Sequence, residues 1–384
     1  MERPSIAMIP SAYNDGIVYS VLPINGAGDL DFARATSATS FNATRVESDG
    51  DIQEVGEDIP RLDYSGSGCP SLLLEPESTN LIKYSEDFSN SYWSKGNITF
   101  QQNSELQPNG QLTGNSVTFD SLNGYIRQFS TVNAGQKYVF SCWVKSNKEG
   151  EIRMARGQQP LDGDDIVVTT NWKRFEVIIT PTSSIDGGQF IKLSANQLDY
   201  IEVFGAQLEQ LLKATSYIPT SGAIGTRVAE TLSKNNLSNY INSSEGVLYA
   251  ELQAISEESD SDRFIYIGDN TATHDNFISI VYKDAGGELA AYGVRNGAES
   301  FYIGTTDYTL TDNLQVAVKW KENDCQLYVN GNLVNTDNST QDFNFTFTDL
   351  KTRKFLGESF YGNIRDLRVY TTALTDEELT QLTS

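Results

Sequence analysis

Histidine, cysteine and basic residues are scarce in this sequence, and each shortage excludes a class of chemistry. His274 is the one histidine, so a Ser-His-Asp site or a Cys-His zinc site lacks the residues it needs. The three cysteines, Cys69, Cys142 and Cys325, are odd in number and far apart. This spacing excludes a disulfide-stapled scaffold and predicts small, buried apolar residues instead.

Positive charge and long apolar runs are also lacking. Lys and Arg number 28 against 51 Asp and Glu, a formal net charge of -23. Binding to nucleic acid or to anionic lipid needs clustered basic residues, so we expect neither. No 18 apolar residues run together, and no apolar segment follows the opening Met-Glu-Arg-Pro. We therefore expect no membrane insertion and no export signal.

Proline is absent from residues 220–384, although six of the ten prolines lie within residues 1–80. In residues 1–80, short apolar pieces alternate with Gly, Ser, Asp and Pro, which favours extended chain and turns. Such a segment buries little by itself. We expect it to be ordered against either its own downstream domain or another protein subunit.

Period-two patterns dominate the rest of the chain. Residues 138–145 alternate with apolar residues on both faces, which predicts a central sandwich strand, and residues 314–321 alternate similarly. Asn330-Gly331 predicts a type I′ hairpin turn. We predict an all-β fold: an extended N-terminal segment (1–80), two antiparallel β-sandwich (jelly roll) domains (81–228 and 246–384) joined by a polar linker (229–245), and a short C-terminal helix.

That helix is predicted over residues 376–382. Thr375 is placed as the N-cap, with Glu378 three residues later to complete a capping box. Leu374 and Leu379 are spaced for a hydrophobic staple. We expect the helix to pack on the edge of a sandwich.

Part of the leading segment resembles a known family. The run from Phe32 to Trp93 is similar to a segment found in many tailed-bacteriophage virion proteins. The similarity is carried by Arg34-Ala-Thr-Ser-Ala-Thr39, Pro60-Arg61, Leu74-Glu75 and Thr79-Asn80-Leu81. It implies an assembly segment that includes Arg34, Arg61, Leu74 and Asn80.

The two predicted sandwiches resemble carbohydrate-associated folds. Ser141-Cys-Trp-Val-Lys145 and Thr215-Ser-Tyr-Ile-Pro-Thr220 resemble a carbohydrate-binding-module-like jelly roll that follows the segment in those virion proteins. The last 140 residues are similar to concanavalin A-like, laminin-G-type sandwiches, through Tyr328-Val-Asn-Gly331, Gly362–Tyr370 and Ala373–Leu379.

Together these resemblances imply a non-enzymatic virion surface protein, of the head-fibre, capsid-decoration or tail-fibre type. It would be made and assembled in the host bacterial cytoplasm and attached to other virion proteins through residues 1–80. We expect a homo-oligomer, a trimer by analogy with fibre proteins. The sandwiches would bind glycans of the host surface. A secreted bacterial lectin is a further reading, which the lack of an export signal disfavours.

Aromatic residues near turns are the candidate glycan contacts, namely Tyr292, Tyr302 and Tyr308. A ring with a polar tip can stack on a sugar and bond to its hydroxyls.

The acidic run around Glu258 and Asp260 leaves two alternatives to plain solvated charge. The first is a polysaccharide depolymerase, because glucanases of this sandwich type carry an E-x-D-x-E run, although Ser259 and Ser261 favour a loop here. The second is Ca²⁺ binding. The candidate ligands are Asp260 and Asp262 in this run, and Asp162 and Asp164 in an earlier one. No other cofactor is expected.

Overall fold

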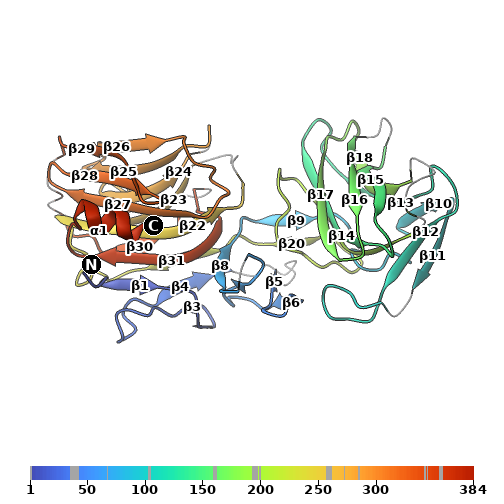
Figure 1. Cartoon of the computed structure of the whole chain (residues 1–384), viewed down its shortest axis with the longest axis horizontal. Helices are drawn as coiled ribbons and strands as arrows, with labels where there is room; N and C mark the ends of the chain where they lie inside the picture. The colour runs from blue at the N-terminus through green and yellow to red at the C-terminus, as the bar shows by residue number, and fades with distance from the viewer. Residues whose placement is uncertain are drawn as a thin grey trace. The chain divides into compact units, whose positions relative to one another are not determined.

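The computed structural model describes residues 2–34, 43–66, 68–102, 105–158, 162–192, 198, 200–256, 262–271, 273–283, 286–340, 343, 345–353 and 358–384. The chain forms two compact units. Unit 1 contains residues 1–35, 57–76 and 229–384, and unit 2 contains residues 36–56 and 77–228. In unit 1 the blue strands of the beginning of the chain stand beside the orange and red strands of its end (Figure 1).

Unit 1 is a sandwich of two antiparallel sheets. Sheet A has the order β29-β28-β27-β22-β31-β8-β7, and β1 also pairs with β31. Its strands are β1 (Ile6–Met8), β7 (Leu62–Asp63), β8 (Ser71–Leu74), β22 (Glu245–Ala254), β27 (Leu314–Lys321), β28 (Cys325–Val329), β29 (Asn332–Asp337) and β31 (Gly362–Tyr370). Sheet B has the order β2-β3-β4-β21-β30-β23-β24-β25-β26. Its strands are β2 (Tyr13–Asn14), β3 (Ile17–Val18), β4 (Leu30–Ala33), β21 (Thr231–Lys234), β23 (Arg263–Gly268), β24 (Phe277–Tyr282), β25 (Leu289–Arg295), β26 (Ala298–Thr305) and β30 (Asp349–Lys351).

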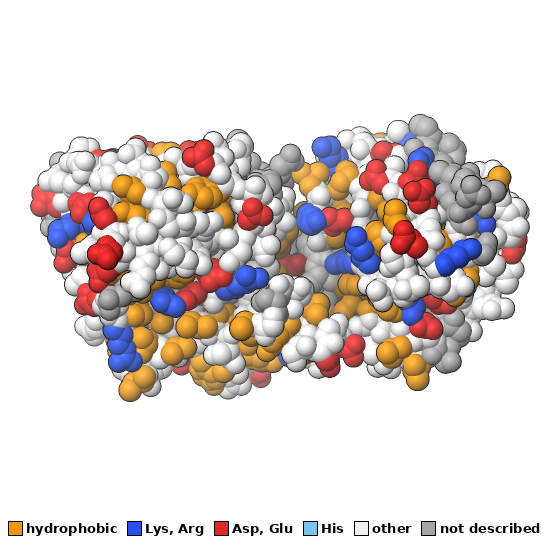
Figure 2. Space-filling view, in the orientation of Figure 1, with side chains coloured by type: hydrophobic (Ala, Val, Ile, Leu, Met, Phe, Trp, Pro, Cys, Tyr) orange, Lys and Arg blue, Asp and Glu red, His pale blue; other side chains and the backbone are white. Residues whose placement is uncertain are grey.

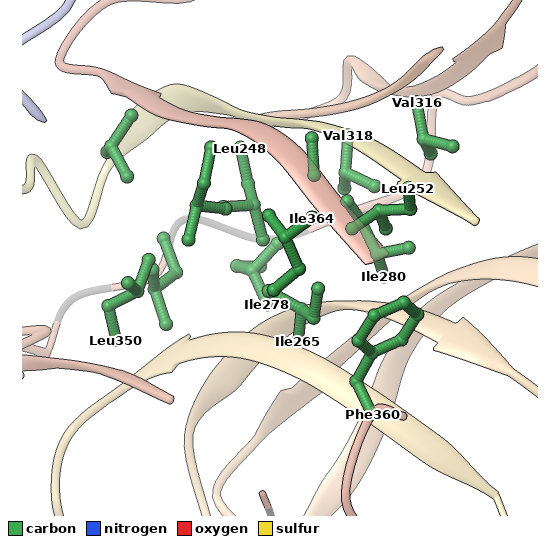
Figure 3. Close-up of a cluster of buried hydrophobic side chains, with 14 of the residues drawn as sticks. Leu248, Leu252, Ile265, Ile278, Ile280, Val316, Val318, Leu350, Phe360 and Ile364 are labelled. Atoms are coloured by element: carbon green, nitrogen blue, oxygen red, sulfur yellow. The ribbon is translucent and has the colours of Figure 1, made fainter. Parts of the chain in front are cut away.

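Alternate residues of these strands build the core between the sheets. From sheet A, Leu248, Val318 and Ile364 meet Ile265 and Ile278 of sheet B, all nearly or completely buried (Figure 3). The period of two along each strand directs these branched side chains to one face and leaves the other for different contacts.

The leading residues are ordered by their own downstream domain, the first of the two expected alternatives. β1 pairs with β31 from Ile6↔Val369 onward, and β8 pairs with the other half of β31 from Leu74↔Gly362. The contacts do not place a domain boundary at residue 80. Residues 1–35 and 57–76 belong to the sandwich of unit 1 instead of forming a separate leading segment.

The predicted linker over residues 229–245 is likewise part of unit 1. Its segment 231–234 is β21, which pairs with β4 and β30. Leu232, Leu237 and Ile241 are buried in the core. Three apolar side chains at irregular spacing among polar neighbours give no periodic signal, which is why the sequence pattern indicated a linker.

The C-terminal helix has the predicted bounds and cap, but it packs against a face of sheet A and not at the edge of the sandwich. α1 spans Asp376–Leu382, and the capping box between Thr375 and Glu378 is present in both directions. Leu379 and Leu382 pack with Leu374 on the outer face of sheet A. The hairpin is confirmed as well, because Asn330 and Gly331 both have positive φ, 46° and 80°, between β28 and β29.

Unit 2 is a second sandwich. Sheet C has the order β10-β13-β18-β15-β16, and sheet D has the order β11-β12-β19-β14-β17. The strands of sheet C are β10 (Trp93–Gly96), β13 (Tyr125–Thr131), β15 (Gly150–Arg156), β16 (Gly163–Val168) and β18 (Ile185–Ile191). Those of sheet D are β11 (Ile98–Gln102), β12 (Asn115–Phe119), β14 (Tyr138–Lys145), β17 (Lys173–Ile179) and β19 (Tyr200–Glu209). Two small pairs complete the unit, β5 (Ala43–Val46) with β6 (Ile52–Val55) and β9 (Ser78–Asn80) with β20 (Gly225–Arg227).

Strand β14 is central in sheet D, as its two apolar faces predicted. It lies between β17 and β19, with Phe140 and Cys142 in the core between the sheets. On its other face Trp143 contacts Tyr217 edge to face, with ring centroids 5.7 Å apart. The buried Tyr217 hydroxyl donates to Glu86 Oε1 over 2.9 Å.

Glu86 gives a pH-dependent prediction. Burial raises the pKa of its carboxyl, and the hydrogen bond from Tyr217 offsets this only in part. The pKa of the Glu86 carboxyl is higher in the folded state than in the unfolded state. At pH values between these two pKa values, the native state binds more protons than the unfolded state, so the free energy of unfolding falls as the pH rises. Glu86→Gln keeps an acceptor for Tyr217 without the buried charge. We expect it to raise the thermal midpoint of unit 2 at pH 7 and to have no such effect below pH ~4. An equal effect at both pH values would contradict this.

Two further expectations concern cysteine and membrane insertion. Cys142 and Cys325 are buried, as predicted, but Cys69 is exposed in a polar turn.

Within the described residues, no helix has the length and hydropathy needed to cross a membrane.

Candidate glycan-binding face

The outer face of sheet B carries a continuous row of polar and aromatic side chains. The register places Tyr266 beside Ser279, Ser279 beside Tyr292, and Tyr292 beside Tyr302 across β23 to β26. Their sequence neighbours, such as Ile265, Ile278 and Ile303, point into the core. We define Tyr266, Ser279, Tyr292 and Tyr302 as the tyrosine row.

Tyr292 and Tyr302 form the accessible end of the tyrosine row. Their ring centroids are 5.9 Å apart at 67°. Tyr302 is 36% exposed, whereas Tyr266 is 1% exposed. An edge-to-face pair at the surface presents apolar ring surface together with two hydroxyl tips, which suits the apolar face and the hydroxyls of a sugar.

Charged groups border this pair. The Tyr302 hydroxyl donates to Glu288 Oε2 over 2.7 Å, and Lys283 Nζ lies 5.8 Å from the Tyr302 ring centroid. Lys283 Nζ also donates to Asp262 Oδ2 over 2.7 Å. Gly304 makes room for Glu288, because a Cβ at this position would lie 1.9 Å from Glu288 Oε1. Donors and acceptors thus stand at the edge of the aromatic surface.

Both phenols remain protonated at neutral pH. Burial and then the neighbouring Glu288 raise the pKa of Tyr302, and burial and then Glu299 raise that of Tyr292. Each hydroxyl therefore keeps its proton; Tyr302 donates its proton to Glu288, and its oxygen can still accept a hydrogen bond.

The third predicted glycan contact, Tyr308, does not lie with the other two. Its ring packs against the core of unit 1, and its hydroxyl donates to the Val329 carbonyl over 3.1 Å. Those contacts give it a structural role in the turn before β27.

The predicted Ca²⁺ ligands do not converge in the described residues. Asp262 pairs with Lys283, Asp162 Oδ2 accepts from the Thr180 amide over 2.7 Å, and Asp164 is exposed on β16. Glu258 and Asp260 lie outside the described residues. In the part of the chain that the structure describes, no three His, Cys, Asp or Glu side chains are grouped as a metal ion requires.

His274 lies at the buried end of the tyrosine row rather than in a purely solvated loop. Its Nδ1 is 3.2 Å from the Tyr266 hydroxyl, and the two rings meet edge to face. It has positive φ, 50°. The sequence pattern gave no sign of this contact, because His274 precedes β24 in a polar stretch.

The predicted assembly residues are all buried in their own units. Leu74 and Asn80 have no exposed surface, and Asn80 Nδ2 donates to the Ala206 and Ile218 carbonyls. Arg61 is fully buried between Glu75 and Glu230, with Nη1 2.7 Å from Glu75 Oε2 and Nε 2.8 Å from Glu230 Oε1.

Arg34 completes this four-residue ion cluster, with Nη1 2.8 Å from Glu230 Oε1. Burial alone lowers the pKa of Arg61, but Glu230 and Glu75 outweigh it and raise that pKa. The ion cluster joins three chain segments of unit 1, so these side chains stabilise the sandwich rather than face a partner.

Comparison with known proteins agrees with the sandwich of unit 1. Residues 250–380 match the family described as the concanavalin A-like lectin/glucanases superfamily. No curated protein matches the chain.

Solved structures resemble parts of the chain. The carbohydrate-binding module CBM40 of a Ruminococcus gnavus IT-sialidase, bound to α2,3-sialyllactose, is 18% identical with a TM-score of 0.33, covering 39% of this chain and 91% of that one. Domain 4 of a Geobacillus stearothermophilus arabinanase, in complex with arabinotriose, is 14% identical with a TM-score of 0.34, covering 41% and 73%. A Cellvibrio mixtus lichenase module, in complex with cellotriose, is 9% identical with a TM-score of 0.24, covering 36% and 99%.

Proposed function

We propose that this protein is a non-enzymatic, glycan-binding surface protein of a bacteriophage particle. The observation that carries the binding function is the surface pair of Tyr292 and Tyr302, bordered by Glu288 and Lys283, on the outer face of a concanavalin A-like sandwich. The pair stacks on a sugar ring while the charged border bonds to its hydroxyls.

A site on the outer face of a sheet, with Tyr302 36% exposed, favours weak binding. Many copies on one particle, or several in a homo-oligomer, would convert weak single contacts into strong attachment through effective concentration. A net charge of -23 keeps so crowded a surface soluble.

The assignment to a particle is supported by the resemblance of residues 32–93 to virion proteins. Exposed apolar side chains in the leading residues offer an attachment surface: Ile9, Tyr19, Val21 and Ile24, of which Ile24 is 90% exposed. Figure 2 shows hydrophobic side chains along the lower edge of unit 1, where β1, β3 and β4 lie. Another virion protein would cover this surface on the particle.

Substitution of Tyr302 tests the glycan-binding function. We expect Tyr302→Ala to weaken binding of the tightest ligand from a glycan array by about tenfold, ~1.4 kcal/mol, measured by titration calorimetry. Tyr19→Ala is the matched control, because Tyr19 is 39% exposed in the same unit. Equal binding by the two variants, no glycan binding by the wild type, or release of sugar from the polysaccharide would overturn the proposal.

The particle assignment has its own test. An antibody against the protein should decorate purified phage particles, and peptides of the chain should be found in them by mass spectrometry. Particles that lack the protein would refute the virion role and leave the binding result untouched.

A further inference from the structure

The outer face of sheet C, in unit 2, carries a second aromatic surface that differs from the tyrosine row. Strand β13 alternates, with Ile126 in the core and Tyr125, Arg127 and Phe129 partly exposed on the other side. We define these three residues as the arginine stack. They are on a different unit from Tyr292 and Tyr302.

Two aromatic rings hold the guanidinium of the arginine stack. Arg127 Cζ lies 4.4 Å from the Tyr125 ring centroid and 4.8 Å from that of Phe129. Arg127 Nη1 donates to the Gly157 carbonyl over 2.9 Å. The planar cation is therefore fixed in position before any ligand arrives, which lowers the entropy cost of binding.

Two glycines leave room for these rings, Gly96 on the neighbouring strand β10 and Gly157 directly after β15. A Cβ at Gly96 would lie 2.5 Å from Tyr125 Cε1, and one at Gly157 would lie 2.6 Å from Phe129 Cε1. A side chain at either position would displace the ring. The small residues thus keep the arginine stack flat against sheet C.

Arg127 has no carboxylate partner among the described residues. Its Nε is buried and also lacks a hydrogen-bond partner there. Arg153, on the same face, differs because its Nε lies 2.7 Å from Asp165 Oδ1. The chain has 51 acidic and 28 basic residues, so most arginines could find a carboxylate partner. An immobilised arginine that has no carboxylate partner among the described residues keeps a positive charge that an acidic ligand can neutralise.

We propose that the arginine stack binds an acidic carbohydrate, with the carboxylate of a uronic-acid or sialic-acid residue at Arg127 and the sugar ring against Tyr125 or Phe129. Nε is buried and Nη1 donates to the Gly157 carbonyl, so a carboxylate would bind at the Nη end of the guanidinium through charge-assisted hydrogen bonds. The rings supply the apolar contact that a free inorganic anion cannot use. The inference rests on the proposed glycan-binding function but uses none of the residues of its site.

The test compares acidic oligosaccharides with their carboxyl-reduced counterparts, using the full chain and titration calorimetry. The probes are a galacturonic-acid tetrasaccharide, a glucuronic-acid oligosaccharide and sialyllactose. We expect at least one acidic probe to bind at least tenfold more tightly than its reduced form. Arg127→Gln should remove this preference, and Arg127→Lys, which keeps the charge but loses the planar group that stacks on the two rings, should retain only part of it.

Arg153→Gln is the matched control and should keep the preference, because that arginine already has a carboxylate partner. Thermal unfolding of each variant establishes that unit 2 is folded. The proposal is overturned if every acidic probe binds no better than its reduced form, if inorganic phosphate or sulfate competes as well as the sugar, or if folded Arg127→Gln binds like the wild type.

The two binding proposals fail separately. Acidic binding that is lost in Tyr302→Ala but not in Arg127→Gln would overturn this inference and support the face of unit 1. Acidic binding that is lost only in Arg127→Gln would support the arginine stack, whatever the fate of the tyrosine row.

Discussion

Deletion of residues 1–34 is expected to unfold unit 1 while leaving unit 2 folded. The deletion removes β1 from sheet A and β2 to β4 from sheet B, together with the buried side chains of Ile6, Met8, Leu30 and Phe32. Each such side chain contributes about 1.5–3 kcal/mol by burial. Their sum is comparable with the whole stability of a domain, about 5–15 kcal/mol.

Hydrogen exchange followed by peptide mass spectrometry measures this result, because it reports on each unit separately. We expect rapid exchange throughout residues 250–380 and unchanged protection in β12 to β19. Removal of residues 1–4 only is the control, since pairing with β31 begins at the Ser5 amide. Native protection of residues 250–380 in the longer deletion would contradict the account.

Arg61→Met is expected to lower the free energy of unfolding of unit 1 by about 3–5 kcal/mol. The substitution removes the cation that faces both Glu75 and Glu230, and so leaves two buried carboxylates without the arginine that pairs with both of them. An uncompensated buried charge is costly because no water is available to solvate it.

Chemical denaturation of the full chain measures the loss. Lys321→Met is the matched control in the same unit, because Lys321 forms an ion pair with Glu245 at the surface, where the lysine side chain is 51% exposed. Surface pairs contribute at most about 1 kcal/mol. A loss of less than 1 kcal/mol for Arg61→Met would show that the ion cluster does not stabilise the unit.

These two predictions change how attachment to a particle can be studied. Residues 1–34 support the sandwich of unit 1, so a truncated protein that fails to join particles would have failed to fold. Point substitutions of exposed residues, such as Val21 and Ile24, address attachment without that complication.

Local signals in the sequence predicted local structure well. The capping box of Thr375 and Glu378 fixed the start of α1, and Asn330-Gly331 fixed the hairpin between β28 and β29, because each depends on contacts within a few residues. The all-β class and the two sandwiches followed from period-two patterns in the longer strands.

Non-local pairing was beyond the sequence patterns. β1 has three residues and its partner in β31 is more than 350 residues away, so neither periodicity nor turn chemistry connects them. The same holds for Arg61. A charged residue is normally exposed unless it is paired, and its partner Glu230 is 169 residues away.

Part of the proposed binding face had been singled out in the sequence. Tyr292 and Tyr302 were expected to contact glycans, and the register of β25 and β26 brings them together. Glu288, Lys283 and Tyr266 were missed, because their position beside the pair depends on how four strands align. Tyr125, Arg127 and Phe129 were also missed, because three alternating residues on one strand do not show which rings stack on the guanidinium.

The most direct measurement is hydrogen exchange of the full chain with and without a saturating concentration of its tightest glycan. The account predicts slower exchange in β24 to β26 of the wild type, no slowing there in Tyr302→Ala, and an intact glycan at the end of the experiment. Unchanged exchange in these strands while the glycan is bound, or a cleaved glycan, would contradict it.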